Sequence, residues 1–389
     1  MLLIEQKIKT KNMKNEISSL ELYYLIMELK ALEGSKIDRI YHQKNNPKEM
    51  TICCHVTSQG KSFLKILLPG IIFIDDAKDA ADTPTGFGMM LRKYLEGARI
   101  KTIEQKDFER VITIILEAKI DSELVKFYLI IELFSKGNII FCDDKLKILN
   151  IVEEQTWKDR TLKRQETYVY PKSRINTLQI TEDDFMEQLK SSDKESLVKA
   201  LAITFNLGGI YAEELCIDAG IEKDRKTKSL TDKDYKSLYK NLTLLLHEET
   251  DANSSDDNIF PFVLESFKSR ETKKYVSFSE AIRENYDSIK HIESKKNVNK
   301  NVEKIQNIIN EQLKVLAESE QGYQENQAKG EIIYEKYQEI SEILKTIKEA
   351  RTKYSWSVIR QKLNDNPEFK KIVKDIDEKN NSIIIEIEK

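Results

Sequence analysis

The stretch VITIILEAKIDSELVKFYLIIELFSKGNIIFC, residues 111–142, decides the fold of the first part of the chain. Its apolar, β-branched and aromatic residues gather in three runs, Val111–Glu117, Leu124–Phe134 and Asn138–Cys142, which predicts three strands. Ser135–Asn138 (SKGN) supplies the glycine and polar residues of a tight hairpin turn. The stretch therefore predicts an antiparallel sheet.

Further strands and two helices surround this stretch. Apolar, β-prone runs predict strands at Ile37–Tyr41, Thr51–Val56, Phe63–Leu68, Ile71–Ile74 and Ile148–Val152. One helix is predicted over about Ser18–Leu32, with Ser18 or Ser19 as its N-cap and Gly34 at its end, and another over about Gly86–Glu96. Together these elements predict an α+β domain over residues 1–175.

The pattern becomes helical after about Thr181. Apolar residues then repeat at helical spacing, at Phe185, Leu189, Leu197, Leu201 and Phe205. Gly208 and Gly209 interrupt the chain before a new helix, and the acidic, polar stretch Asp251–Asn258 predicts a loose loop. Residues 176–290 are therefore predicted to form a helical domain.

Residues 291–389 are predicted to form a coiled-coil arm with an incomplete middle region. A narrow apolar stripe surrounded by charges carries this prediction, at Val302, Ile305, Ile309, Leu313 and Leu316. A lone helix with such a stripe is unstable and needs a partner. We therefore expect the arm to self-associate, or to pair with a second arm that the sequence does not reach.

Composition favours a binding protein without a cofactor over an enzyme. The 63 basic and 66 acidic residues nearly cancel, so a nucleic-acid binder would have to gather positive charge locally. The four cysteines form no CxxC pair and the four histidines are scattered, which predicts buried thiols and no metal site. No P-loop, nucleophile elbow or HExxH motif is found. Without a secretion signal or an apolar run of about 20 residues, a cytoplasmic protein is expected.

Two groups of residues are candidates for contact with nucleic acid. Arg92, Lys93 and Arg99 flank the apolar residues of the second predicted helix and could meet phosphates; an ordinary amphipathic helix with a solvated basic edge is the alternative. Gly208 and Gly209 lie between two predicted helices, where the backbone can approach a phosphate closely. This is the helix-hairpin-helix pattern, and simple helix packing is its alternative.

A third candidate is the pair Glu109–Arg110 where a predicted strand begins. A carboxylate beside a guanidinium can orient Arg110 toward a phosphate or a base edge. The alternative is a surface ion pair that contributes little.

Several segments, in order, resemble one family over nearly the whole chain. They include LKALEGSKIDRIY (29–41), FGMMLRKYLEGAR (87–99), the LGGIYAEELC segment (207–216), and GEIIY (330–334) with Trp356. The resemblance is to the NFACT family, called NEMF in animals and RqcH in bacteria and often labelled fibronectin- or fibrinogen-binding protein. By this resemblance the chain is truncated before the second coiled-coil arm and the C-terminal RNA-binding domain, and residues 1–12 precede the family's usual start.

The resemblance implies a ribosome quality-control factor. It would bind the large ribosomal subunit carrying stalled peptidyl-tRNA and recruit tRNA, chiefly alanyl-tRNA, for template-free C-terminal tailing of the nascent chain. It also implies a first domain similar in fold to the N-terminal domain of formamidopyrimidine-DNA glycosylases, whose catalytic N-terminal proline this chain lacks. The family's usual Asp-Arg pair is Glu109–Arg110 here, and Gln165 stands where a glycine is common. A fibronectin-binding adhesin and a DNA-lesion binding module are the alternatives.

Overall fold

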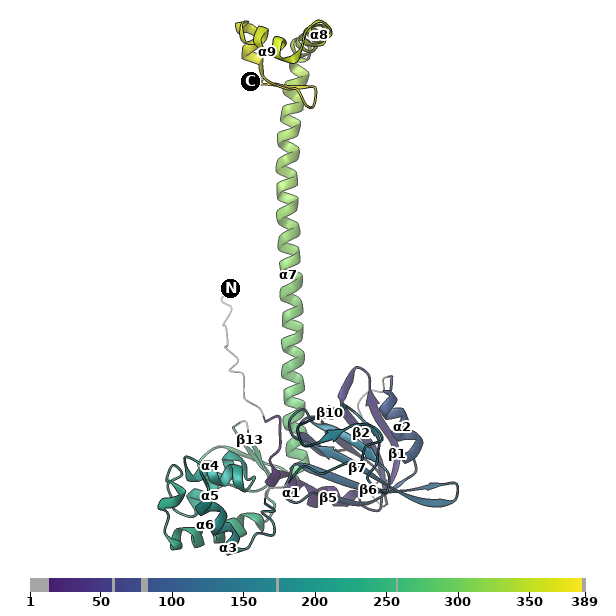
Figure 1. The fold of residues 1–389 in the computed structure, drawn as a ribbon, viewed down its shortest axis with the longest axis vertical. Helices are drawn as coiled ribbons and strands as arrows, with labels where there is room; N and C mark the ends of the chain where they lie inside the picture. The colour runs from purple at the N-terminus through teal and green to yellow at the C-terminus, as the bar shows by residue number, and fades with distance from the viewer. Residues whose placement is uncertain (1–13, 58–59, 78–82, 173–174, 257, 387–389) are drawn as a thin grey trace. The chain divides into compact units, whose positions relative to one another are not determined.

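The computed structural model describes residues 14–57, 60–77, 83–172, 175–256 and 258–386, so the predicted extension at 1–12 lies outside them. The chain divides into two compact units, Met1–Glu293 and Ser294–Lys389. Figure 1 shows the order of the elements along the chain. The predicted division into three parts at residues 175 and 290 stays a prediction.

A nine-stranded antiparallel sheet, in the order β4-β3-β2-β1-β5-β6-β7-β8-β9, forms the centre of the first unit. Its strands are β1 (Lys36–Gln43), β2 (Asn46–Val56), β3 (Gly60–Leu67), β4 (Ile71–Asp75), β5 (Arg99–Gln105), β6 (Val111–Ile120), β7 (Glu123–Glu132), β8 (Asn138–Cys142) and β9 (Ile148–Ile151). Two meanders, β1–β4 and β5–β9, meet where Lys36 pairs with Arg99. The predicted α+β fold is therefore confirmed for this part.

Strand β5 was not predicted, and Arg99 lies on it rather than on a continuation of the preceding helix. Helix α2 (Gly86–Leu95) ends before Gly97, which has φ +89°. Only two of the seven β5 side chains, Ile100 and Ile103, are buried. A strand with so few apolar residues on its inner face gives a weak signal in the sequence.

Helix α1 (Ser19–Leu29) lies between two hydrophobic cores of the first unit (Figure 1). Leu22, Leu25, Ile26 and Leu29 pack with the apolar residues of the sheet and of α2. Leu20 and Tyr24, on another side of the helix, pack with the helices that follow the sheet. The 3₁₀ turn Lys30–Leu32 continues α1, so both ends of the predicted helix are close to those observed.

Four helices form the second core: α3 (Glu182–Ser191), α4 (Leu197–Thr204), α5 (Gly208–Asp218) and α6 (Asp232–Leu246). The loop predicted over Asp251–Asn258 is wrong. β12 (Asn253–Ser255) pairs there with β13 (Asn258–Phe260) and with β14 (Thr272–Lys274), because Ala252, Ile259 and Phe260 supply apolar anchors among the polar residues. After β9, the short strands β10 (Gln155–Thr156) and β11 (Thr161–Leu162) pair with each other in a separate two-stranded sheet.

Helix α7 (Phe278–Glu335) begins in the first unit, where Phe278, Ala281 and Ile282 are buried in the sheet's core. The second unit continues with α8 (Tyr337–Lys353), α9 (Trp356–Asn364), α10 (Pro367–Ile372), β15 (Val373–Asp377) and β16 (Ser382–Ile385). Its small core gathers around Ile343, Ile347 and Val373. The predicted apolar stripe, Val302 to Leu316, is exposed on α7, and its pairing stays a prediction.

Candidate nucleic-acid interface

The turn between β5 and β6 carries Arg110 into contact with the helical part of the first unit. Phe108, in this turn, is fully buried in the second core. Gln105 Nε2 donates to the carbonyl of Ser19 at the start of α1 (3.0 Å) and to the carbonyl of Glu109 (3.0 Å). The apolar anchor and these hydrogen bonds hold the turn against α1, and Arg110 is the residue that follows.

Arg110, Gly208 and Gly209 line one pocket of about 360 Å³. The other lining residues come from the segment before α1, the start of α1, and the α4–α5 connection: Lys14, Glu16, Ile17, Ser18, Ser19, Glu21, Ala202, Asn206, Leu207, Ile210 and Tyr211. Two helix N-termini therefore open onto the same space. Three of the residues proposed from the sequence meet there.

The start of α5 has no side chain to cap it. Its N-cap is the apolar Leu207, and no acidic residue occupies the first turn. Gly208 has φ +76°, a conformation that L side chains rarely adopt, and a Cβ on Gly209 would meet no atom within 4 Å. The first N–H groups of a helix have no acceptor within the helix. This end of α5 can therefore receive an anion at its backbone.

The start of α1 is satisfied by its own residues. Ser18 Oγ accepts from the Glu21 backbone (3.2 Å), and Glu21 Oε2 accepts from the Ser18 backbone (2.8 Å), which forms a capping box. Glu21 is fully buried, pairs with Lys14, and accepts from the Tyr211 hydroxyl (2.7 Å). Burial, and then the Glu21 carboxylate, raise the pKa of Tyr211 well above its usual range. Tyr211 is therefore held as a hydroxyl donor.

Glu16 is the carboxylate that orients the Arg110 guanidinium. Arg110 Nη1 donates to Glu16 Oε2 at 2.7 Å, with 28% of the Arg110 side chain and 48% of the Glu16 side chain exposed. Sequence reasoning missed Glu16, because the two residues are 94 positions apart. Glu109 is half-buried beside Arg110, and its role as the orienting carboxylate stays a prediction.

The other predicted basic residues lie elsewhere, and none of them lines this pocket. Arg99 is at the opposite end of β5 from the Arg110 turn, about 20 Å away by strand rise, and its Nη1 donates to the Gly34 carbonyl. Arg92 Nε donates to the Ile40 carbonyl (2.7 Å), and the guanidinium lies 5.9 Å from the Tyr41 ring centroid. Lys93 is exposed, with Nζ 5.5 Å from the Tyr94 centroid. The structure therefore divides the predicted surface into two places.

Cys53, Cys54, Cys142 and Cys216 are buried and form no disulfide with one another, as predicted. Among the residues that the structure describes, no three His, Cys, Asp or Glu side chains gather as metal ligands would. No helix in the described ranges combines the length and the apolar character needed to cross a membrane.

Comparison with known proteins gives matches over nearly the whole chain. Residues 18–381 match the family described as NFACT N-terminal and middle domains. The archaeal Rqc2 homolog aRqcH of Methanocaldococcus jannaschii is 28% identical over 96% of this chain and 58% of its own length. The Rqc2 homolog RqcH of Streptococcus suis is 30% identical over 56% of this chain and 43% of its own length. The chain thus spans about half the length of these relatives.

A solved structure shares the fold of the first unit's sheet and helices. The N-terminal part of the fibronectin/fibrinogen-binding protein from Streptococcus suis superposes with a TM-score of 0.59 and 22% identity, over 70% of this chain and all of that one. The likeness to a glycosylase domain, the helix-hairpin-helix assignment and the coiled coil stay predictions. The family match, the ordered sequence motifs and this shared fold agree: the chain belongs to the NFACT family.

Proposed function

We propose that this chain acts in ribosome quality control by binding tRNA. In this proposal it binds the large ribosomal subunit carrying stalled peptidyl-tRNA and recruits tRNA, alanyl-tRNA in particular, for template-free C-terminal tailing. The observation that carries the proposal is the meeting of Arg110 with the uncapped start of α5 in one pocket. The names of the relatives, Rqc2 homolog aRqcH and ribosome quality control complex subunit 2 of Saccharomyces cerevisiae among them, support it.

Arg110 and the backbone of α5 supply two different kinds of phosphate donor. A guanidinium presents a planar pair of N–H groups that match two phosphate oxygens. The first N–H groups of a helix point along its axis, and the absence of side chains on Gly208 and Gly209 lets a phosphate approach the start of α5. An RNA backbone carries phosphates at regular intervals, so one strand can use both donors. This use of α4 and α5 would be that of a helix-hairpin-helix.

Glu16 is the partner that RNA would replace on Arg110. Both side chains are partly exposed, and ion pairs between exposed side chains contribute only about 0–1 kcal/mol. A phosphate can accept hydrogen bonds from the Arg110 guanidinium and from the α5 backbone at once, which is more than the Glu16 carboxylate accepts from Arg110 alone. The Glu16 carboxylate then keeps Arg110 oriented until RNA arrives.

We infer that the protein positions tRNA and catalyses no reaction itself. The hydroxyl of Tyr211 and the carboxylate of Glu21 are bound to each other and buried, so the pocket offers RNA neither as a nucleophile. Peptide-bond formation would belong to the ribosome.

Binding of labelled tRNA to the full chain tests the proposal. We expect Arg110→Ala to weaken binding at least about tenfold and to lower the slope of log affinity against log salt by about 1. Lys119→Ala is the matched control, since Lys119 is an exposed cation at the far end of β6, about 30 Å away along the strand. Equal tRNA affinities for the parent and Arg110→Ala would refute the proposal.

Glu16→Gln refines the same measurement. Removing the competing carboxylate leaves Arg110 available to phosphate, so this variant should bind tRNA as tightly as the parent or more tightly. A loss as large as that of Arg110→Ala would mean that Glu16 itself contacts the RNA.

Immobilised fibronectin provides the comparison with the adhesin alternative. The solved streptococcal protein of the same fold is named for fibronectin binding. Retention on fibronectin, together with no measurable tRNA binding, would replace the present proposal with that one.

A further inference from the structure

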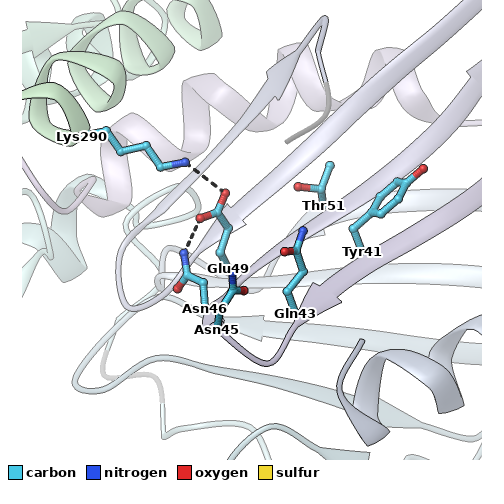
Figure 2. Close-up of a pocket in the computed structure, with 7 residues that line it drawn as sticks. All are labelled: Tyr41, Gln43, Asn45, Asn46, Glu49, Thr51 and Lys290. Carbon is cyan, nitrogen blue, oxygen red and sulfur yellow. Dashed lines mark hydrogen bonds and ion pairs between the residues drawn. The ribbon is translucent and has the colours of Figure 1, made fainter. Parts of the chain in front are cut away.

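A second pocket, polar and small, lies at the β1–β2 hairpin (Figure 2) and shares no lining residue with the pocket at Arg110. Its volume is about 220 Å³, and it is lined by Tyr41, Gln43, Asn45, Asn46, Glu49 and Thr51, with Lys290 from α7. Pockets for drug-sized ligands usually measure about 300–1,000 Å³. A single ring system fits this one.

The register of the sheet explains why polar groups gather here. Tyr41 of β1 pairs with Thr51 of β2, and Met50 and Ile52 on either side of Thr51 point into the hydrophobic core. Tyr41, Gln43 and Thr51 therefore share the opposite face, because side chains alternate along a strand. Figure 2 shows these three side chains together on the two neighbouring strands.

Helix α7 contacts this face, and its Lys290 forms one wall of the pocket. Tyr286 packs against Phe73 at 5.9 Å between ring centroids, and Arg283 pairs with Asp76 at 3.1 Å. About two turns after Arg283, Lys290 reaches the hairpin and pairs with Glu49 at 3.6 Å. The pocket therefore lies between the hairpin and α7.

Glu49 is a positioning residue for this wall. Its Oε2 accepts from Asn46 Nδ2 (2.6 Å) and from the Tyr286 hydroxyl (3.2 Å), while Lys290 pairs with Oε1. The carboxylate and the ammonium neutralise each other inside the lining. The pocket therefore selects for neither an anion nor a cation, and its chemistry is that of neutral amides, a hydroxyl and an aromatic ring.

We propose that this pocket binds one unpaired base of an RNA strand. Gln43 and Asn45 line the pocket with side-chain amides, a group that carries the two kinds of hydrogen-bonding atom that base edges pair with. Unstacked RNA bases bind proteins by hydrogen bonds to such edges and by contact with aromatic rings, which Tyr41 supplies. Lys44 and Lys48, both exposed at the hairpin, supply positive charge for the adjoining phosphates. This inference rests on the proposed function, because it assumes an RNA ligand.

Hexanucleotides with and without bases test the proposal on the full chain. Fluorescently labelled rA6 and a hexamer of abasic sites carry the same phosphates, so only a base pocket separates them. We expect the parent to bind rA6 about tenfold more tightly than the abasic hexamer, the scale of one stacked and hydrogen-bonded base. Equal binding of the two probes, or no binding of either, would overturn the proposal.

Two variants test whether the preference for rA6 depends on residues of the pocket. Gln43→Leu keeps a side chain of similar size but removes the amide. Asn45→Ala removes the amide of an exposed turn residue. Both should lose most of the preference for rA6. Gln188→Leu, the same change at an exposed position on α3, should retain it. A preference that survives in both pocket variants would also overturn the proposal.

The outcomes separate this inference from the proposed function. If Arg110→Ala weakens tRNA binding while Gln43→Leu leaves the base preference intact, only the base pocket is wrong. If the base preference depends on Gln43 while tRNA binding does not respond to Arg110, the pocket stands and the proposed tRNA site falls.

Discussion

Helices α1 and α5 begin at the same pocket, yet side chains cap the N-terminus of α1 and none caps that of α5. The start of α1 has a serine cap, a buried glutamate and a lysine that pairs with it. The start of α5 has an apolar N-cap and two glycines. Helix N-termini attract anions in general, but one that is satisfied internally has little left to offer. The contrast identifies α5, with Arg110, as the end that can bind a ligand.

Removing the buried carboxylate of α1 should have the largest effect. In Glu21→Ala, the Ser18 backbone N–H and the Tyr211 hydroxyl lose their acceptor, and Lys14 loses its counter-ion. We expect the free energy of unfolding, from urea denaturation, to fall by about 3 kcal/mol. Glu213→Ala, which removes an exposed glutamate from α5, should change it by less than about 0.5 kcal/mol. Similar losses in the two variants would contradict the internal role of Glu21.

The two glycines of α5 should respond differently to alanine. Gly208→Ala forces a side chain into φ +76° and should lower the free energy of unfolding by about 1–2 kcal/mol. Gly209→Ala meets no atom within 4 Å and should raise it by about 0.5–1 kcal/mol. If the start of α5 binds phosphate, Gly209→Ala should nevertheless weaken tRNA binding. Unchanged affinity in this more stable variant would remove the α5 backbone from the proposed site.

The smallest effect is expected at the cap of α1. Ser18→Ala removes the oxygen that accepts from the Glu21 backbone, and N-cap serines contribute about 1 kcal/mol. Thermal unfolding of Ser18→Ala beside Ser18→Gly measures this, because glycine at an N-cap costs only a few tenths of a kcal/mol. Equal stability of the parent and Ser18→Ala would show that Glu21 closes this helix start without the serine.

Much of the sheet and the start of α1 could be predicted from local sequence. The runs within 111–142 became β6, β7 and β8, and the glycine of the SKGN turn, Gly137, has φ +71°. Gln165, where the family commonly has glycine, also has a positive φ, +71°, which explains that preference. Strand β5 and the hairpin at β12–β13 were missed because few of their residues are apolar. Both form because their backbones hydrogen-bond to neighbouring strands, which a local sequence pattern does not show.

The candidate site was predicted residue by residue but not as an arrangement. Arg110, Gly208 and Gly209 were each proposed from the sequence, and the structure places them in one pocket. Arg92 was also proposed from the sequence, as a basic residue beside an apolar helix face, yet its guanidinium donates to the Ile40 carbonyl. The sequence shows how many basic side chains the chain has, but not which of them already donate hydrogen bonds within the fold.

The sequence by itself determined the strand runs, the capped start of α1 and the glycines before α5, since each depends on residues a few positions apart. Only the tertiary structure decided that Glu16 would hold Arg110 across 94 positions, and that buried Phe108 would bring Arg110 to the start of α5. The physical reason is range. Capping, turns and strand propensity act between near neighbours, whereas a binding site depends on which distant surfaces the packing of two hydrophobic cores brings together.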